Sequence, residues 1–147
     1  MIQRIQTVYI FCAAVITALL FVFDFAEIAV NGELYVFNVT GIRHGEEVIF
    51  DGLPLMGFTG LITLLHVVAI FMYKNRIRQI RMLAFTIILL LGLIGIMFYF
   101  LHSGFKSPEV AYQIPITFPL IAAIFDYLAI RAIGKDEALV RSLDRIR

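Results

Sequence analysis

Two ionisable side chains, Asp126 and His66, lie inside long apolar stretches of the sequence. A carboxylate in an apolar environment is costly, and such a group often marks an ion or proton pathway. Asp126 would also be satisfied by an ion pair, either with Arg131 or with a basic residue of the segment 74–81. His66 could relay protons, bind a metal ion or form a hydrogen bond with a neighbouring helix. For both side chains the sequence favours the structural alternative, and the functional one stays open.

A second set of chemically capable side chains comprises Asp24, Glu27 and His102. The two carboxylates lie near the end of the first apolar run, and His102 follows the third run. Oxygen and imidazole ligands of this kind could hold a divalent cation, although an ordinary solvated helix end is the favoured interpretation. Cys12 is the single cysteine, so an internal disulfide or a CxxC metal site cannot form, and we expect it to pack as a small apolar side chain.

Enzyme motifs are absent from the sequence, which has no Gly-rich phosphate loop, no HExxH and no nucleophile elbow. A bis-histidine haem site would need two histidines within the apolar runs, and only His66 meets that condition. We therefore expect no cofactor, no metal ion and no catalytic residues, and the sequence favours a non-enzymatic protein.

The elements that must position these side chains are four long apolar runs. The chain has 147 residues, of which 61% are hydrophobic and 16% charged, whereas soluble domains average about 45–50% apolar and about 25% charged. Each run has roughly the 20 residues that cross a bilayer core as a helix. Because backbone groups find no water in lipid, we expect one all-α membrane domain, a bundle of four transmembrane helices. The expected parts are spans at 7–28, 53–73, 82–101 and 114–133, an outer loop at 29–52 and a tail at 134–147.

The basic residues predict the orientation of these spans. The loop at 74–81, the tail, Arg4 and Arg131 at the end of the fourth span together hold ten of the 12 Lys and Arg residues, and the other side keeps Arg43 and Lys106. The positive-inside rule then places both termini in the cytoplasm. The acidic residues concentrate near the opposite side, so the outer surface should be anionic.

The outer loop at 29–52 contains two segments, 33–40 and 46–52, that are rich in β-branched and aromatic residues. Two short strands joined by a turn at 41–45 would form a small β-hairpin. An isolated hairpin is marginally stable in water. The second outer loop, at 102–115, or a partner protein would therefore have to support it.

The charged ending of the chain also has a regular pattern. Gly134 is a plausible C-cap for the fourth span. Beyond it, apolar residues recur at helical spacing, which predicts a short cytoplasmic amphipathic helix that could lie on anionic lipid, pack under the bundle or dock a partner. The residues expected to make these contacts are Leu139, Val140, Leu143, Ile146, Arg141 and Arg145.

The opening MIQRIQTVYI, the basic loop KNRIRQ and the ending KDEALVRSLDRIR resemble the DUF4293 family. The resemblance covers essentially the whole chain, and the polar order of the ending is its most specific part. Gly134 stands where we would expect the family to have a basic residue. The resemblance implies a small four-helix inner-membrane protein of Bacteroidota with no assigned activity, and it supplies no catalytic residues.

Two classes of function remain open. The first is an accessory, assembly or scaffold subunit of a larger inner-membrane complex, whose partners are the lipid bilayer and either other membrane proteins or further copies of the chain. The second is a small carrier or membrane enzyme that uses Asp126 and His66. The lack of an enzyme motif, the structured outer loop and the ordered tail favour the first class. No specific binding of nucleic acid is expected.

Overall fold

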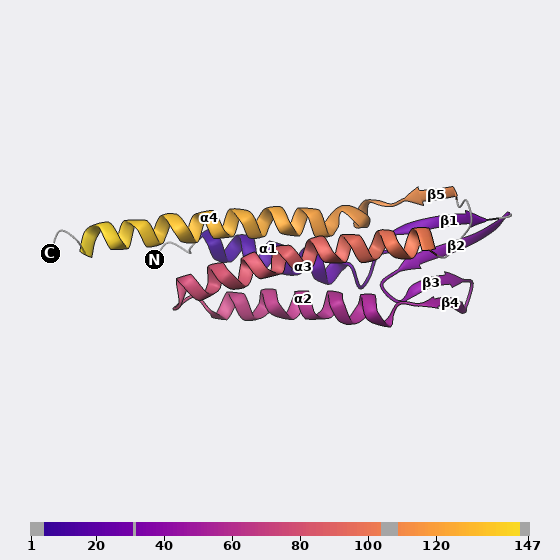
Figure 1. The fold of residues 1–147 in the computed structure, drawn as a ribbon, viewed down its shortest axis with the longest axis horizontal. Helices are drawn as coiled ribbons and strands as arrows, with labels where there is room; N and C mark the ends of the chain where they lie inside the picture. Colours follow the sequence, from indigo (N-terminus) through magenta and orange to yellow (C-terminus); the bar gives the residue numbers. More distant parts are fainter. Residues whose placement is uncertain (1–4, 31, 104–108, 145–147) are drawn as a thin grey trace.

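Within residues 5–30, 32–103 and 109–144, which the computed structural model describes, the chain forms four α-helices and a small sheet. The helices are α1 (Ile5–Leu19), α2 (Leu53–Phe71), α3 (Arg76–Ser103) and α4 (Phe118–Asp144), and a short 3-10 helix, η1 (Ile114–Thr117), directly precedes α4. Figure 1 shows the helices running along the long axis of the molecule with the sheet at one end. The turn between α2 and α3 lies at the opposite end of α2.

The four helices pack as a bundle with a defined order of neighbours. Helix α1 packs against α2 and α4, and α3 packs against the same two helices. Helices α2 and α4 therefore occupy opposite corners, and in Figure 1 they lie below and above the other two. This arrangement decides which interior side chains can meet across the centre.

The lengths and surfaces of the helices indicate a membrane protein. Among the described residues, three helical segments are long and apolar enough to cross a membrane: Leu53–Phe71, Arg76–His102 and Ile114–Leu139. Large apolar side chains also cover the outside of the bundle, with Phe71 74% exposed and Ile88 65% exposed. Water-soluble monomers rarely expose contiguous apolar surfaces of this kind.

The sheet at the end of the bundle has five antiparallel strands in the order β4-β3-β2-β1-β5. The prediction of a two-stranded hairpin is therefore wrong in the number of strands. The segment assigned to its turn contains a strand of its own, and the second outer loop contributes the support that the hairpin was expected to need. The strands are β1 (Ala26–Val30), β2 (Glu33–Asn38), β3 (Gly41–His44), β4 (Glu47–Asp51) and β5 (Glu109–Tyr112).

The expectation of a first helix that continues to residue 28 is also wrong. Helix α1 ends at Leu19, and after a turn the chain enters β1, which pairs with β2 on one side and β5 on the other. The 15 residues of α1 span only about 22 Å at 1.5 Å per residue. Apolar residues of the following segment are exposed, including Val22 at 75%. The apolar run is thus divided between a helix and a strand, because pairing on both edges of β1 outweighs continuation of the helix.

Two glycines join the sheet to α2. Gly41 has a φ of 115°, and a Cβ there would overlap the Phe50 carbonyl. A Cβ on Gly52, the residue before α2, would overlap the backbone of Gly41. The Gly52 amide donates a hydrogen bond to the carbonyl of Thr40 at 2.9 Å. This close approach holds the start of α2 against β3.

As far as Asp144 the charged ending is helical, but it is not a separate helix. Helix α4 runs from Phe118 to Asp144 without a break at Gly134, so the predicted C-cap there is wrong. A glycine inside a helix costs only about 1 kcal/mol relative to alanine, which its neighbours can offset. Leu139 is 64% exposed. The side chains of Val140, Arg141 and Leu143, and the residues Arg145 and Ile146 as a whole, lie outside the described part of the chain.

Candidate functional site

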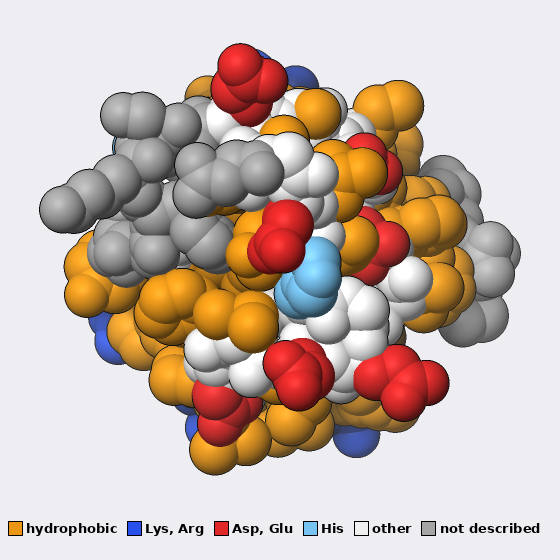
Figure 2. All heavy atoms as spheres, turned by 90° about the vertical axis from the view of Figure 1, so that its right-hand side faces the viewer, with side chains coloured by type: hydrophobic (Ala, Val, Ile, Leu, Met, Phe, Trp, Pro, Cys, Tyr) orange, Lys and Arg blue, Asp and Glu red, His pale blue; other side chains and the backbone are white. Residues whose placement is uncertain are grey.

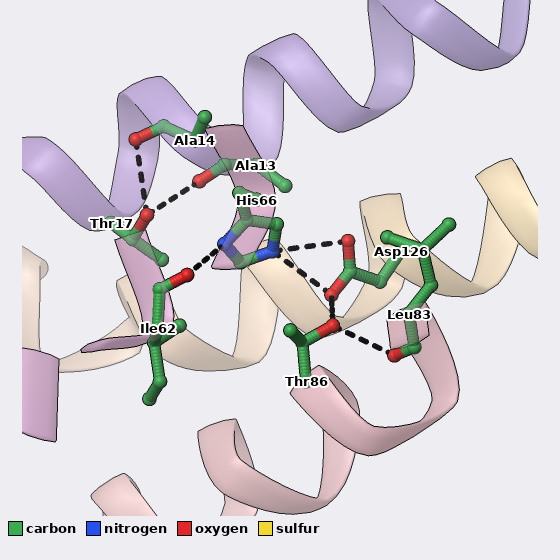
Figure 3. A network of polar contacts seen from close by, with 8 residues as sticks. All are labelled: Ala13, Ala14, Thr17, Ile62, His66, Leu83, Thr86 and Asp126. Carbon is green, nitrogen blue, oxygen red and sulfur yellow. Dashed lines mark hydrogen bonds and ion pairs between the residues drawn. The ribbon is translucent and has the colours of Figure 1, made fainter. Parts of the chain in front are cut away.

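Three polar side chains meet in the interior of the bundle: His66 from α2, Thr86 from α3 and Asp126 from α4 (Figure 3). Each is 0% exposed. The Nε2 atom of His66 lies 3.1 Å from Oδ1 and 3.0 Å from Oδ2 of Asp126. The Thr86 hydroxyl lies 2.8 Å from Oδ2 of the same carboxyl group. Because α2 and α4 are on opposite corners, the contact between His66 and Asp126 crosses the centre of the bundle.

The expected ion pair between Asp126 and an arginine is wrong. Residues five positions apart on a helix point about 140° away from each other. Arg131 therefore faces outward, where it is exposed and its guanidinium lies 6.0 Å from the centre of the Tyr127 ring. Of the basic segment 74–81, Arg76 pairs with Glu137 at 3.4 Å. Asp126 instead contacts His66. This contact is the structural alternative stated above for His66, a hydrogen bond to another helix.

The geometry indicates where the hydrogens of the pair lie. The Nδ1 atom of His66 is 3.0 Å from the Ile62 carbonyl oxygen, which only accepts, so we infer that Nδ1 carries a hydrogen and donates it. A hydrogen must then also lie between Nε2 and the carboxyl group. Either His66 is an imidazolium beside a carboxylate, or His66 is neutral beside a protonated Asp126. The pair has no net charge in either state, which lowers the cost of burying it.

Thr86 is compatible with both positions of that proton. Its hydroxyl oxygen lies 2.8 Å from the Leu83 carbonyl and 2.8 Å from Asp126 Oδ2, and it has a single hydrogen. The hydroxyl can donate to a carboxylate. When Asp126 is protonated, its hydrogen lies on Oδ1 and is donated to His66 Nε2, and the Thr86 hydroxyl still donates to Oδ2. The cluster could therefore hold a proton and move it over a short distance without leaving a polar atom unpaired.

The cluster separates two apolar cores. The larger core extends from the sheet into the bundle, and the smaller core lies toward the α2–α3 turn. On each contributing helix the polar residue lies between one member of each core. The flanking pairs are Ile62 and Ala69 on α2, Leu90 and Leu83 on α3, and Ala122 and Ala129 on α4. The polar side chains thus form a thin layer across an otherwise apolar interior.

The other proposed ligand set does not come together. Asp24 accepts a hydrogen bond from Asn38 at 3.1 Å, and Glu27 accepts one from Gln113 at 3.1 Å. His102 contacts the carbonyl of Phe98 at 3.0 Å. Among the described residues, no group of three or more His, Cys, Asp or Glu side chains is arranged to hold a metal ion.

Among the described residues, sequence reasoning missed four buried polar side chains: Gln6, Thr17, Gln79 and Thr86. Thr86 lies within the third apolar run. The only feature of the sequence that could have pointed to it is that it is a single threonine among apolar residues. Gln79 lies among the arginines of the basic segment, yet it is buried and donates to the Ala69 carbonyl at 2.8 Å. Within the part of the chain that the structure describes, the Oε1 atom of Gln79 and the Nε2 atom of Gln6 are buried without a hydrogen-bond partner. Both glutamines belong to the end of the bundle away from the sheet.

Apolar helices long enough to cross a membrane, with a buried polar layer among them, define a helical membrane protein. The sequence matches DUF4293, described as a domain of unknown function, over residues 2–146. Because this match covers nearly the whole chain, the protein belongs to the DUF4293 family, as the resemblance predicted. No curated protein matches the sequence.

Proposed function

We propose that the protein is a multi-pass inner-membrane protein that acts, without catalysis, as an accessory, assembly or scaffold subunit of a larger complex. The observation that carries this proposal is the edge strand β4. All five of its residues are exposed, including Val48 at 47% and Ile49 at 45%. An edge strand with exposed apolar side chains is a template for pairing with another chain, and soluble proteins usually protect such edges.

The charges around this edge favour a partner of a different kind from the protein itself. Glu47 and Asp51 flank the apolar centre of β4, and acidic side chains are spread over the sheet end of the molecule (Figure 2). If two copies paired β4 antiparallel and centred on each other, Glu47 of each would lie opposite Asp51 of the other. Like charges in that position are destabilising. A strand with an apolar centre and basic ends is a better complement.

The proposed orientation places this edge outside the cytoplasm. The basic segment 74–81 lies at the α2–α3 turn, which is at the opposite end of the bundle from the sheet. The positive-inside rule then assigns the turn to the cytoplasm and the sheet to the outer side. Helix α1 and the exposed apolar segment after it would provide the fourth crossing.

Substitution of Ile49 by Asp tests the proposal. The matched control is Leu34→Asp, because Leu34 is 64% exposed on the same sheet but belongs to the interior strand β2. Each tagged variant is purified from native membranes in mild detergent, and co-purifying proteins are identified by mass spectrometry. We expect a stoichiometric partner with the wild type and with Leu34→Asp, and its loss with Ile49→Asp. A wild-type chain that purifies alone, or an Ile49→Asp chain that keeps its partner, would contradict the proposal.

The buried pair supports a second candidate, a small proton carrier. His66 and Asp126 share a proton position inside the bundle, and Thr86 accommodates either location of it. Purified protein in vesicles that contain a pH-sensitive dye distinguishes the two functions. A proton flux that Asp126→Asn abolishes would favour the carrier, whereas equal flux in protein-free vesicles would exclude it.

A further inference from the structure

We propose that a cavity at the α2–α3 turn binds the phosphate of an anionic phospholipid headgroup. The cavity has a volume of about 620 Å³ and is lined by residues 73–78 and Glu137. Its charged side chains are three cations, Lys74, Arg76 and Arg78, and a single carboxylate. This site is independent of the sheet edge, which lies at the other end of the bundle.

The cations have different roles in the cavity. Arg76 is partly buried and contacts both the Glu137 carboxylate at 3.4 Å and the Asp136 carbonyl at 3.3 Å, so it ties the start of α3 to α4. Lys74 and Arg78 are exposed, and neither forms an ion pair within the described residues. The two exposed cations therefore give the cavity a net positive charge that an anion can neutralise.

The backbone adds to this charge. Helix α3 begins at Arg76 and is 28 residues long. The first amides of a helix have no partner within it, and they carry a partial positive charge that favours phosphate. Residues 76–78 of that first turn are part of the cavity lining. The side-chain cations and the helix terminus thus attract the same kind of ligand.

The position of the cavity identifies a lipid as the source of the phosphate. Helix α2 ends its apolar segment at Phe71, and α3 begins with three arginines before its uncharged apolar run starts at Met82, so the turn lies where the apolar surface stops. Phe71 and Ile77 are exposed beside it, at 74% and 47%. Tyr73 is also exposed, and tyrosine is enriched at the level of the headgroups. A phospholipid can place its phosphate among the cations while its acyl chains lie on the neighbouring apolar side chains.

Lipid binding by the full-length protein in detergent tests this inference. Fluorescent phosphatidylglycerol is titrated into the wild type, the double variant Lys74→Gln/Arg78→Gln and the matched control Arg81→Gln. Arg81 is an exposed cation on the same helix, but it does not line the cavity. Each headgroup contact by Lys or Arg contributes about 1 kcal/mol, so the double variant should bind about 25-fold more weakly. The control should keep the wild-type affinity, and Arg78→Lys should retain binding because it keeps the charge.

Two further arms identify the ligand. A phosphatidylcholine probe with the same acyl chains should bind more weakly than phosphatidylglycerol. Inorganic phosphate should compete poorly, because it lacks the acyl chains. Equal binding of the two lipids, or an equal loss of affinity in Arg81→Gln, would overturn the proposal. Displacement of the lipid by phosphate at equal concentration would also overturn it and indicate a site for a soluble anion. Thermal unfolding of each variant in the same detergent verifies that the chain is folded.

Discussion

The Nε2 atom of His66 lies 3.0 Å from Oδ2 of Asp126, although 60 positions separate the two residues in the chain. The contact joins helices on opposite corners of the bundle, within a polar layer that separates two apolar cores. Each partner compensates for the burial of the other, so removal of either one alone leaves the remaining partner unpaired.

We therefore expect Asp126→Leu to destabilise the protein by about 1–3 kcal/mol, which is the cost of an unsatisfied buried polar group. Asp126→Asn should be milder, because its amide can still donate to the His66 ring and accept from Thr86. Thermal unfolding in detergent provides the measurement. The double variant His66→Leu/Asp126→Leu should be more stable than the sum of the single effects predicts. Additive losses would show that the pair is not coupled.

The glycine junction between the sheet and α2 gives a second prediction. Gly41→Ala should strongly destabilise the sheet, because the new Cβ would overlap the backbone at Phe50. Gly45→Ala is the control: Gly45 also has a positive φ, of 60°, but a Cβ there would meet no atom within 4 Å. Only the cost of the left-handed backbone, about 1–2 kcal/mol, is expected at Gly45. Limited proteolysis of the sheet should rank Gly41→Ala well above Gly45→Ala in sensitivity.

A third prediction concerns pH and the sheet. The Tyr35 hydroxyl donates to Glu33 at 2.8 Å, and this hydrogen bond raises the pKa of Tyr35 above its ordinary value of 10.0. The hydrogen bond stabilises the protonated phenol. Its contribution to stability is therefore present below pH about 10 and is lost as the pH rises through the folded-state pKa. Glu33→Gln should lower the pKa of Tyr35. The titration of Tyr35 is followed by tyrosinate absorbance, and the signal of the other tyrosines is removed by subtracting the titration of the same protein with Tyr35→Phe. An unchanged titration would show that Glu33 has no effect on it.

The orientation can be tested with single cysteines, because Cys12 is the only native thiol. In a Cys12→Ser background, Leu34→Cys lies on the sheet and Asn75→Cys lies at the α2–α3 turn. A membrane-impermeant thiol reagent added to intact cells whose outer membrane is permeabilised should label position 34 only. Position 75 should react after the inner membrane is disrupted. Labelling of both positions from the same side would contradict the proposed arrangement of crossings.

The sequence located the later helices well and their contacts poorly. Helices α2, α3 and α4 follow from apolar runs of about 20 residues, since the need to satisfy the backbone in lipid is a local constraint. Asp126 and His66 were both recognised as unusual. Their pairing depends on which helices lie opposite each other, and no local pattern carries that information. The nearest cation in the chain, Arg131, was therefore the wrong partner.

The five-stranded sheet shows the same limit. Strands β2 and β4 are visible as short segments of β-branched and aromatic residues. Strand β1 is hidden at the end of an apolar run that by itself resembles a longer helix. Its strand conformation depends on pairing at both edges, with β2 on one side and with β5, across more than half of the chain, on the other.

That pairing has a consequence for the order in which the protein is made. The amide of Gln113 donates to the carbonyl of Phe25 at 2.9 Å, so the segment that leaves α1 is bonded to the segment that leads into α4. During synthesis, β1 emerges long before β5, and the edge of β1 that pairs with β5 stays open until residues 109–112 have been translated. Open edges are the surfaces that pair wrongly with other chains. A nascent chain that stops after α3 therefore exposes an unfinished sheet, and synthesis of the last quarter of the protein closes it.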